Sequence, residues 1–173
     1  SCSGRWRASG SSSMSASMVR SDSAVAQHAR QKPSSRSKSI KAKLDTGART
    51  SSIHAYATTV FERDGVDWVR FRVRPWQESV EDEVVIECPV HDRRRVRSSS
   101  GHVQERYVVL MRVLLVGHEV LAEVTLSNRD QMGFRMLIGR EALRHGFDVS
   151  SARSFVGGRA PKSTRRRNRG REL

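Results

Sequence analysis

The chain has 173 residues, of which 36% are hydrophobic, and its 32 Lys and Arg against 18 Asp and Glu give a formal charge of +14. This length suits one domain of ordinary size, and no apolar run approaches the roughly 20 residues of a membrane-spanning helix, so no membrane partner is expected. The two cysteines, Cys2 and Cys88, exclude a disulfide-rich scaffold and a four-cysteine zinc site.

The positive charge is concentrated at the two ends of the chain. Residues 1–40 hold seven Lys or Arg and one acid, and residues 159–173 hold the same numbers. The first segment also contains 14 Ser without regular apolar spacing, so residues 1–39 are predicted to be disordered. Its composition also resembles that of an organellar transit peptide, which leaves the compartment open between cytoplasm and organelle. Residues 158–173 are predicted to be a disordered basic tail, for which solvation is favoured over nucleic-acid binding.

The segment between these ends, residues 40–157, is predicted to be one domain of short strands. Alternating or continuous apolar residues predict strands at 69–74, 83–88, 107–116, 119–126 and 134–138. Asp64-Gly65 is a hairpin turn signal before the first of these strands. A short helix is expected at 140–145, where Gly146 would end it. Several short strands at this spacing predict an all-β fold, a small closed barrel with one short C-terminal helix.

Two short stretches carry the chemistry. In Leu44-Asp45-Thr46-Gly47-Ala48 an acid directly follows an apolar strand and enters a tight loop, in which Gly47 permits close backbone approach. The second stretch, Met136-Leu137-Ile138-Gly139-Arg140, is an apolar strand that ends in Gly and leads into the predicted helix.

Together these stretches resemble the retropepsin-like aspartic proteases, in which an apolar-Asp-Thr-Gly loop is crossed by a later apolar-apolar-Gly strand. Residues 40–55 and 125–140 resemble one bacterial subfamily more closely, and the likeness runs from about residue 40 to 157. This subfamily is labelled as ATP-dependent zinc proteases and is often encoded near the glutamate ligase RimK. The chain has no His-Glu-x-x-His motif and no Gly-x-x-x-x-Gly-Lys-Ser/Thr loop, so neither a metal nor any other cofactor is expected.

The resemblance implies an aspartic endopeptidase whose catalytic loop is Asp45, Thr46 and Gly47. Aspartic proteolysis needs two carboxylates that share one proton, and the chain contains one Asp-Thr-Gly. A homodimer with Asp45 from each copy at its two-fold axis is therefore expected. Thr46 would join the two loops, and Gly47 would leave room for substrate. The competing acid, Asp130, is interpreted instead as a turn residue or an Arg partner.

The substrate is expected to be a polypeptide, and the RimK association points to a glutamate-rich one. The flap of the family is assigned to residues 93–107, whose arginines would pair with carboxylates or else protect a solvated hairpin edge. Arg140 could equally be a structural ion-pair partner. The candidate substrate-binding residues are Arg49, His54, Arg95, Arg97, Arg135 and Arg140. The alternative function is a catalytically inactive β-barrel module that recognises acidic peptides.

Overall fold

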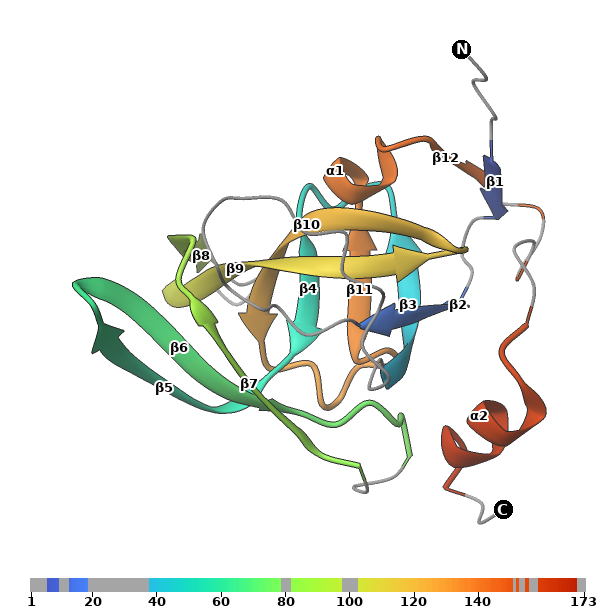
Figure 1. Ribbon diagram of the computed structural model, residues 1–173. Coiled ribbons are helices and arrows are strands. Elements are labelled where there is room, and N and C mark those ends of the chain that lie inside the picture. The colour runs from blue at the N-terminus through green and yellow to red at the C-terminus, as the bar shows by residue number, and fades with distance from the viewer. Residues whose placement is uncertain are drawn as a thin grey trace.

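A computed structural model of the chain (Figure 1) describes residues 6–9, 13–18, 38–78, 82–97, 103–150, 152, 155 and 159–170. Strands dominate, as the sequence predicts. They are β1 (Trp6–Ser9), β2 (Ser13–Met18), β3 (Lys38–Asp45), β4 (Ser51–His54), β5 (Tyr56–Arg63), β6 (Val66–Val73), β7 (Val84–Pro89), β8 (Asp92–Arg97), β9 (Val103–Leu115), β10 (His118–Ser127), β11 (Met136–Gly139) and β12 (Phe147–Ser150). The two helices of the described residues are short: α1 (Arg140–Leu143) and α2 (Lys162–Arg167).

The strands form three sheets. The largest has the order β10-β4-β11-β3-β2-β9-β8. Strand β9 also pairs with β10, so the six strands from β10 to β9 are hydrogen-bonded in a ring. The second sheet is β5-β6-β7, and the third pairs β1 with β12. The expected all-β class is confirmed, but the whole is an assembly of sheets and not one closed barrel. The reason is that, among the described strands, β5, β6 and β7 pair only with one another.

Tight turns and strand alternation explain the predicted central elements. Asp64 and Gly65 lie in the left-handed backbone region, with φ of 53° and 73°, and join β5 to β6 as the turn signal predicts. Along β6, Val69, Phe71 and Val73 are buried while the arginines between them are exposed. The predicted short helix is found as α1, and Gly146 follows it with a φ of 102°.

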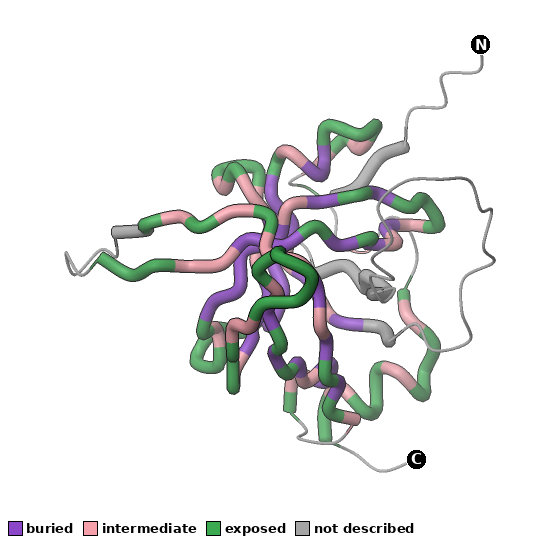
Figure 2. Tube along the Cα trace, turned by 60° about the vertical axis from the view of Figure 1, so that its left-hand side comes forward, coloured by how far each residue is buried: buried purple, intermediate pink, exposed green. Residues whose placement is uncertain are grey.

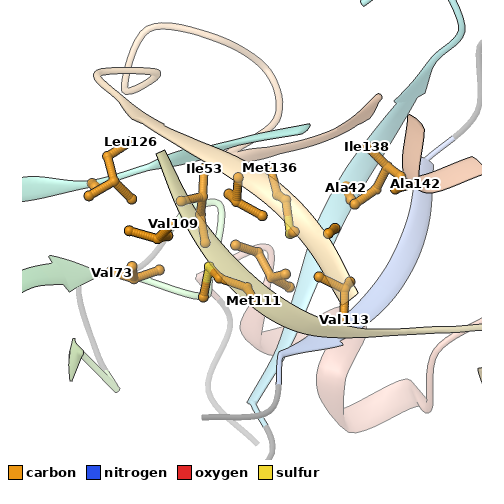
Figure 3. Close-up of a cluster of buried hydrophobic side chains, with 14 of the residues drawn as sticks. Ala42, Ile53, Val73, Val109, Met111, Val113, Leu126, Met136, Ile138 and Ala142 are labelled. Atoms are coloured by element: carbon orange, nitrogen blue, oxygen red, sulfur yellow. The ribbon is translucent and has the colours of Figure 1, made fainter. Parts of the chain in front are cut away.

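The core lies where strands of the first two sheets face each other. Figure 2 shows buried residues gathered in the middle of the molecule and exposed residues toward the outer ends of the strands. Figure 3 shows the centre of this core, with side chains contributed by β3, β4, β6, β9, β10, β11 and α1. The same strands that carry the two motif stretches therefore belong to the most completely packed part of the fold.

The two ends differ from the sequence prediction. Strands β1 and β2 lie inside the segment 1–39, which the sequence predicted to be disordered, and α2 lies inside the predicted disordered tail. The strands take their hydrogen bonds from distant partners, because β1 pairs with β12 while β2 pairs with β3 and β9. The helix is held by contacts with Trp76, Gln77 and Asp82, described below. Local composition carries no sign of such long-range partners.

The described residues include no helix that is long and apolar enough to cross a membrane.

Candidate active site

Asp45 is presented by a strand end and fixed by its own loop. Along β3 the alternate residues Ile40, Ala42 and Leu44 are buried, which leaves Asp45 half-buried on the opposite face. The loop folds back so that the backbone N–H groups of Gly47 and Ala48 donate to Asp45 Oδ1, at 3.0 and 3.2 Å. A Cβ at Gly47 would lie 3.3 Å from that oxygen. The second carboxylate oxygen, Oδ2, accepts neither of these two bonds.

Gly139 lets the loop approach the neighbouring strand. It lies in register with Asp45 in the parallel pairing of β3 with β11. A Cβ at Gly139 would stand 2.5 Å from the carbonyl carbon of Thr50 and 2.8 Å from the carbonyl oxygen of Arg49. No side chain fits in that space, so glycine is required here by close packing of backbone on backbone.

Further hydrogen bonds hold the loop on the start of α1. The Ser51 hydroxyl, buried at 1% exposure, accepts the N–H of Gly139 at 3.1 Å. The N–H of Arg140 donates to the carbonyl of Ala48 at 2.9 Å, and the Arg140 guanidinium reaches the carbonyl of Gly47 at 3.3 Å. In this structure Arg140, a candidate substrate-binding residue, thus positions the Asp45 loop. Thr46 is exposed at the tip of the loop.

Two cations, Lys43 and Arg129, lie near the Asp45 carboxylate, and sequence reasoning missed them. Lys43 lies on the same face of β3, with its Nζ 3.8 Å from Asp45 Oδ2. The Arg129 guanidinium comes from the loop after β10 and is anchored to the Ser52 hydroxyl at 3.1 Å. Burial lowers the pKa of Arg129, the charge of Asp45 opposes this shift, and Arg106 of β9 adds to it. The signal available in the sequence was the alternation of β3, which places Lys43 beside Asp45.

Two of the predicted substrate-binding residues lie instead in a buried polar cluster at the other end of β4. His54 is 5% exposed, its Nδ1 accepts the N–H of Arg129 at 3.0 Å, and its Nε2 lies 3.8 Å from Asp130. Arg135 is 7% exposed, lies 4.0 Å from the same carboxylate, and donates to the carbonyl of Arg74. Asp130 is therefore an Arg partner, as interpreted from the sequence, and the cluster ties loops together.

The surroundings of His54 favour its neutral form. Burial lowers the pKa of His54, and the neighbouring Asp130 carboxylate opposes this effect, whereas the charge of Arg135 reinforces it. The hydrogen bond accepted by Nδ1 also favours the neutral ring, because a protonated ring would present a donor to another donor. His54 thus acts as a neutral structural residue in this arrangement.

The predicted flap segment is a hairpin. Strand β8 pairs with β9 in antiparallel register from Asp92↔Val108 to Arg97↔Val103, while residues 98–102 at the expected tip lie outside the described residues. Figure 2 shows the hairpin projecting from the body of the molecule. Arg95 is exposed on β8, opposite Glu105, and Arg97 ends the strand. The positive charge of Arg106, on β9 of this hairpin, lowers the pKa of Arg129 because the two cations repel each other.

The remaining candidate, Arg49, is exposed, and its Nε lies 4.0 Å from the Glu141 carboxylate on the outer side of the Asp45 loop.

The part of the chain that the structure describes holds no group of three or more His, Cys, Asp or Glu side chains able to bind a metal ion. Cys88 is buried in β7, and His91 lies 3.5 Å from Glu123.

Comparison with known proteins places this geometry in a family. Residues 31–160 match the family model described as RimB-like, the retropepsin-like aspartic endopeptidase RimB. The chain belongs to the RimB-like family. The match includes the Asp45 loop, the Gly139 strand, Lys43 and Arg129, and it ends before α2 begins. The resemblance drawn from the two sequence stretches is thereby confirmed.

Curated relatives share the same region. A probable alpha-L-glutamate ligase of Shewanella halifaxensis is 47% identical over 116 residues, which are 67% of this chain and 25% of that protein. Another, from Desulfotalea psychrophila, is 42% identical over 127 residues, or 72% of this chain and 27% of that protein. This chain thus spans about a quarter of the length of the curated relatives it matches.

A solved structure has the same fold. The crystal structure of Lpg0085, a protein of unknown function from Legionella pneumophila, superposes with a TM-score of 0.66 at 23% identity. The superposition covers 89% of this chain and 99% of the Legionella chain.

Proposed function

We propose that the chain is an aspartic endopeptidase in which two copies of Asp45, one from each subunit of a homodimer, activate a water molecule for peptide hydrolysis. The observation that carries this proposal is the Asp45 loop. Two backbone N–H groups fix one carboxylate oxygen, and the other remains available beside Lys43. Membership of a retropepsin-like family supports the same conclusion.

The proposed reaction divides the work between the two carboxylates. One is ionised and takes a proton from water, whose oxygen attacks the peptide carbonyl carbon. The other is protonated and donates a hydrogen bond to the carbonyl oxygen as that oxygen gains negative charge. Collapse of the intermediate breaks the C–N bond, and the carboxyl group that took the proton from water passes it to the leaving nitrogen. Because the sequence has one Asp-Thr-Gly, the second carboxylate is assigned to a second copy.

Acidic polypeptides are the proposed substrates. Three cations support this choice: Lys43 lies 3.8 Å from Asp45, the charge of Arg129 interacts with Asp45, and Arg106 lies close enough to Arg129 to lower its pKa. Arg pairs with carboxylates in two-point geometry and is well suited to bind Glu side chains. The relatives named as probable glutamate ligases support a link to glutamate-containing substrates.

The test is cleavage of a protein that carries a glutamate tail, with its tail-less form as the comparison substrate. Wild type, Asp45→Asn and the control Asp64→Asn are incubated with each substrate, and the products are weighed by mass spectrometry. Asp64 is a suitable control because it is an exposed turn residue whose left-handed φ Asn also tolerates. We expect cleavage by wild type and by the control, and none by Asp45→Asn. Cleavage that persists in Asp45→Asn would overturn the proposal.

A non-catalytic binding module is the second candidate, because the same three cations would hold an acidic peptide without any chemistry. This candidate predicts that wild type and Asp45→Asn both bind a glutamate peptide and leave it intact. The endopeptidase predicts the same binding for Asp45→Asn, with cleavage by wild type.

A further inference from the structure

A cavity of about 290 Å³ lies beside the outer face of β3 and is closed on one side by α2. Four of the residues that line it are cations and one is an acid, and an aromatic ring contributes to its wall. They are Lys41, Glu78, Phe155, Arg159, Arg165 and Arg169. Neither the strand nor the helix makes this cavity alone, because its cations come from β3 and from residues 159–169.

Helix α2 is held in place beside the cavity. The side-chain oxygen of Asn168 accepts the N–H of Gln77 at 3.2 Å. On the neighbouring turn, the Arg167 guanidinium binds the Asp82 carboxylate at 3.3 Å and stacks on the Trp76 ring. These contacts fix Arg167 and Asn168 at the end of the helix, and Arg165, Asn168 and Arg169 line the cavity.

The charges in the cavity are not balanced. Among the described residues, no carboxylate oxygen lies within ion-pair distance of Lys41, Arg159, Arg165 or Arg169, although Glu78 shares the lining. Lys41 lies over the Phe134 ring at 4.8 Å and Arg159 over the Phe155 ring at 5.6 Å, contacts that orient a cation without neutralising it. An anion is therefore the ligand that this cavity favours.

The distance between the cavity and Asp45 indicates which kind of anion would bind there. Lys41, Lys43 and Asp45 alternate on the same face of β3, so Lys41 lies about 13 Å from Asp45 along the strand. An extended peptide advances by about the same distance in four residues. Lys43 and Arg129 occupy the interval, since Arg129 Nε donates to the carbonyl of Phe134, whose ring lies under Lys41.

We propose that this cavity is a remote subsite that takes an acidic side chain about four residues from the peptide bond held at Asp45. The proposal rests on the proposed function and adds a location that the Asp45 surroundings do not include. Arg165 and Arg169 lie beyond residues 31–160, the part of the chain that matches the family model. The subsite predicts a preference for long acidic peptides over short ones.

The test measures binding to the full-length Asp45→Asn protein, which cannot consume its ligand. The probes are fluorescent peptides of three and of eight glutamates. Arg165→Gln with Arg169→Gln removes two cavity cations, and Arg166→Gln with Arg144→Gln removes the same charge from exposed positions that do not line the cavity. Circular dichroism melts establish that both double variants are folded.

We expect the cavity variant to bind the eight-residue peptide roughly five- to tenfold more weakly and the three-residue peptide unchanged, with less than a twofold effect in the control variant. Equal weakening in both variants, or no weakening in the cavity variant, would overturn the subsite. Tighter binding of an eight-residue oligothymidylate through the same two arginines would also overturn it, in favour of a nucleic-acid site. Because no cleavage is measured, this result is independent of whether wild type proves to be a protease.

Discussion

Gly139 stands in register with Asp45 across the β3–β11 pairing, and the carbonyl of Thr50 lies where its side chain would begin. The two motif stretches, 94 residues apart in sequence, are thus one structural unit. Asp45 is held by a tight loop at the end of β3. That loop can pack against β11 only because residue 139 is a glycine and has no Cβ.

Gly139→Ala is expected to damage both stability and activity. A Cβ there meets backbone atoms at 2.5–2.8 Å, which forces the Asp45 loop away from β11. We expect the free energy of unfolding to fall by about 2 kcal/mol or more, measured by urea denaturation, together with loss of cleavage. Gly133→Ala is the matched control, because a Cβ at Gly133 meets no atom within 4 Å. Equal stability of the two variants would contradict the packing argument.

The paired-carboxylate mechanism predicts a dominant effect of an inactive subunit. When wild type and Asp45→Asn are mixed in equal amounts and allowed to exchange, only about one quarter of the dimers carry two aspartates. Cleavage per wild-type chain should then fall by about half, and further as the variant is added in excess. Activity that stays proportional to the wild-type concentration alone would show that each chain works independently.

Arg129→Met is expected to change substrate preference more than folding. The substitution removes the guanidinium that interacts with Asp45 and retains much of the apolar stem. We expect the ratio of kcat/KM for an acidic peptide to that for a neutral peptide to fall about tenfold, because a charge-assisted contact is lost. Arg112→Met is the control, since Arg112 is an exposed residue that pairs with Glu119. If this ratio does not change, Arg129 does not contact the acidic substrate.

His54 is expected to make stability pH-dependent near neutrality. Its pKa is lowered in the folded chain, so between its folded pKa and about 6.5 the unfolded chain binds the extra proton. Stability should therefore be complete above about pH 7 and decline as the pH falls below about 6.5, by at most about 1.4 kcal/mol per pH unit. The measurement is urea denaturation between pH 7.5 and 5.

The control for that experiment is His54→Asn, whose amide oxygen can accept the Arg129 N–H in place of Nδ1. The variant should lose most of the slope between pH 7 and 5. Glu83, Glu87, Asp92 and Glu123 have lowered pKa values because arginines or Tyr56 hydrogen-bond to them, so their contribution disappears only at more acidic pH. A slope that is the same in both proteins would assign the pH dependence to other groups.

The sequence by itself determined the features that depend on local pattern. Alternation defined β6, the Asp64-Gly65 pair defined its turn, and the Asp45 and Gly139 stretches identified the family. These succeed because side-chain periodicity and tight-turn chemistry are properties of a few consecutive residues.

The tertiary structure alone decided which charged residues meet Asp45 and which become structural. The Arg129 guanidinium is bound to Ser52 on β4, and its charge interacts with Asp45. His54 and Arg135, inside the same motif stretches, are buried at the far end of that strand beside the exposed carboxylate of Asp130. Likewise α2 was read as a solvated basic tail, and only its contacts with Gln77 and Asp82 place its arginines beside Lys41. The sequence does not distinguish a substrate-binding arginine from a structural or solvated one, because the role of the side chain depends on partners many residues away.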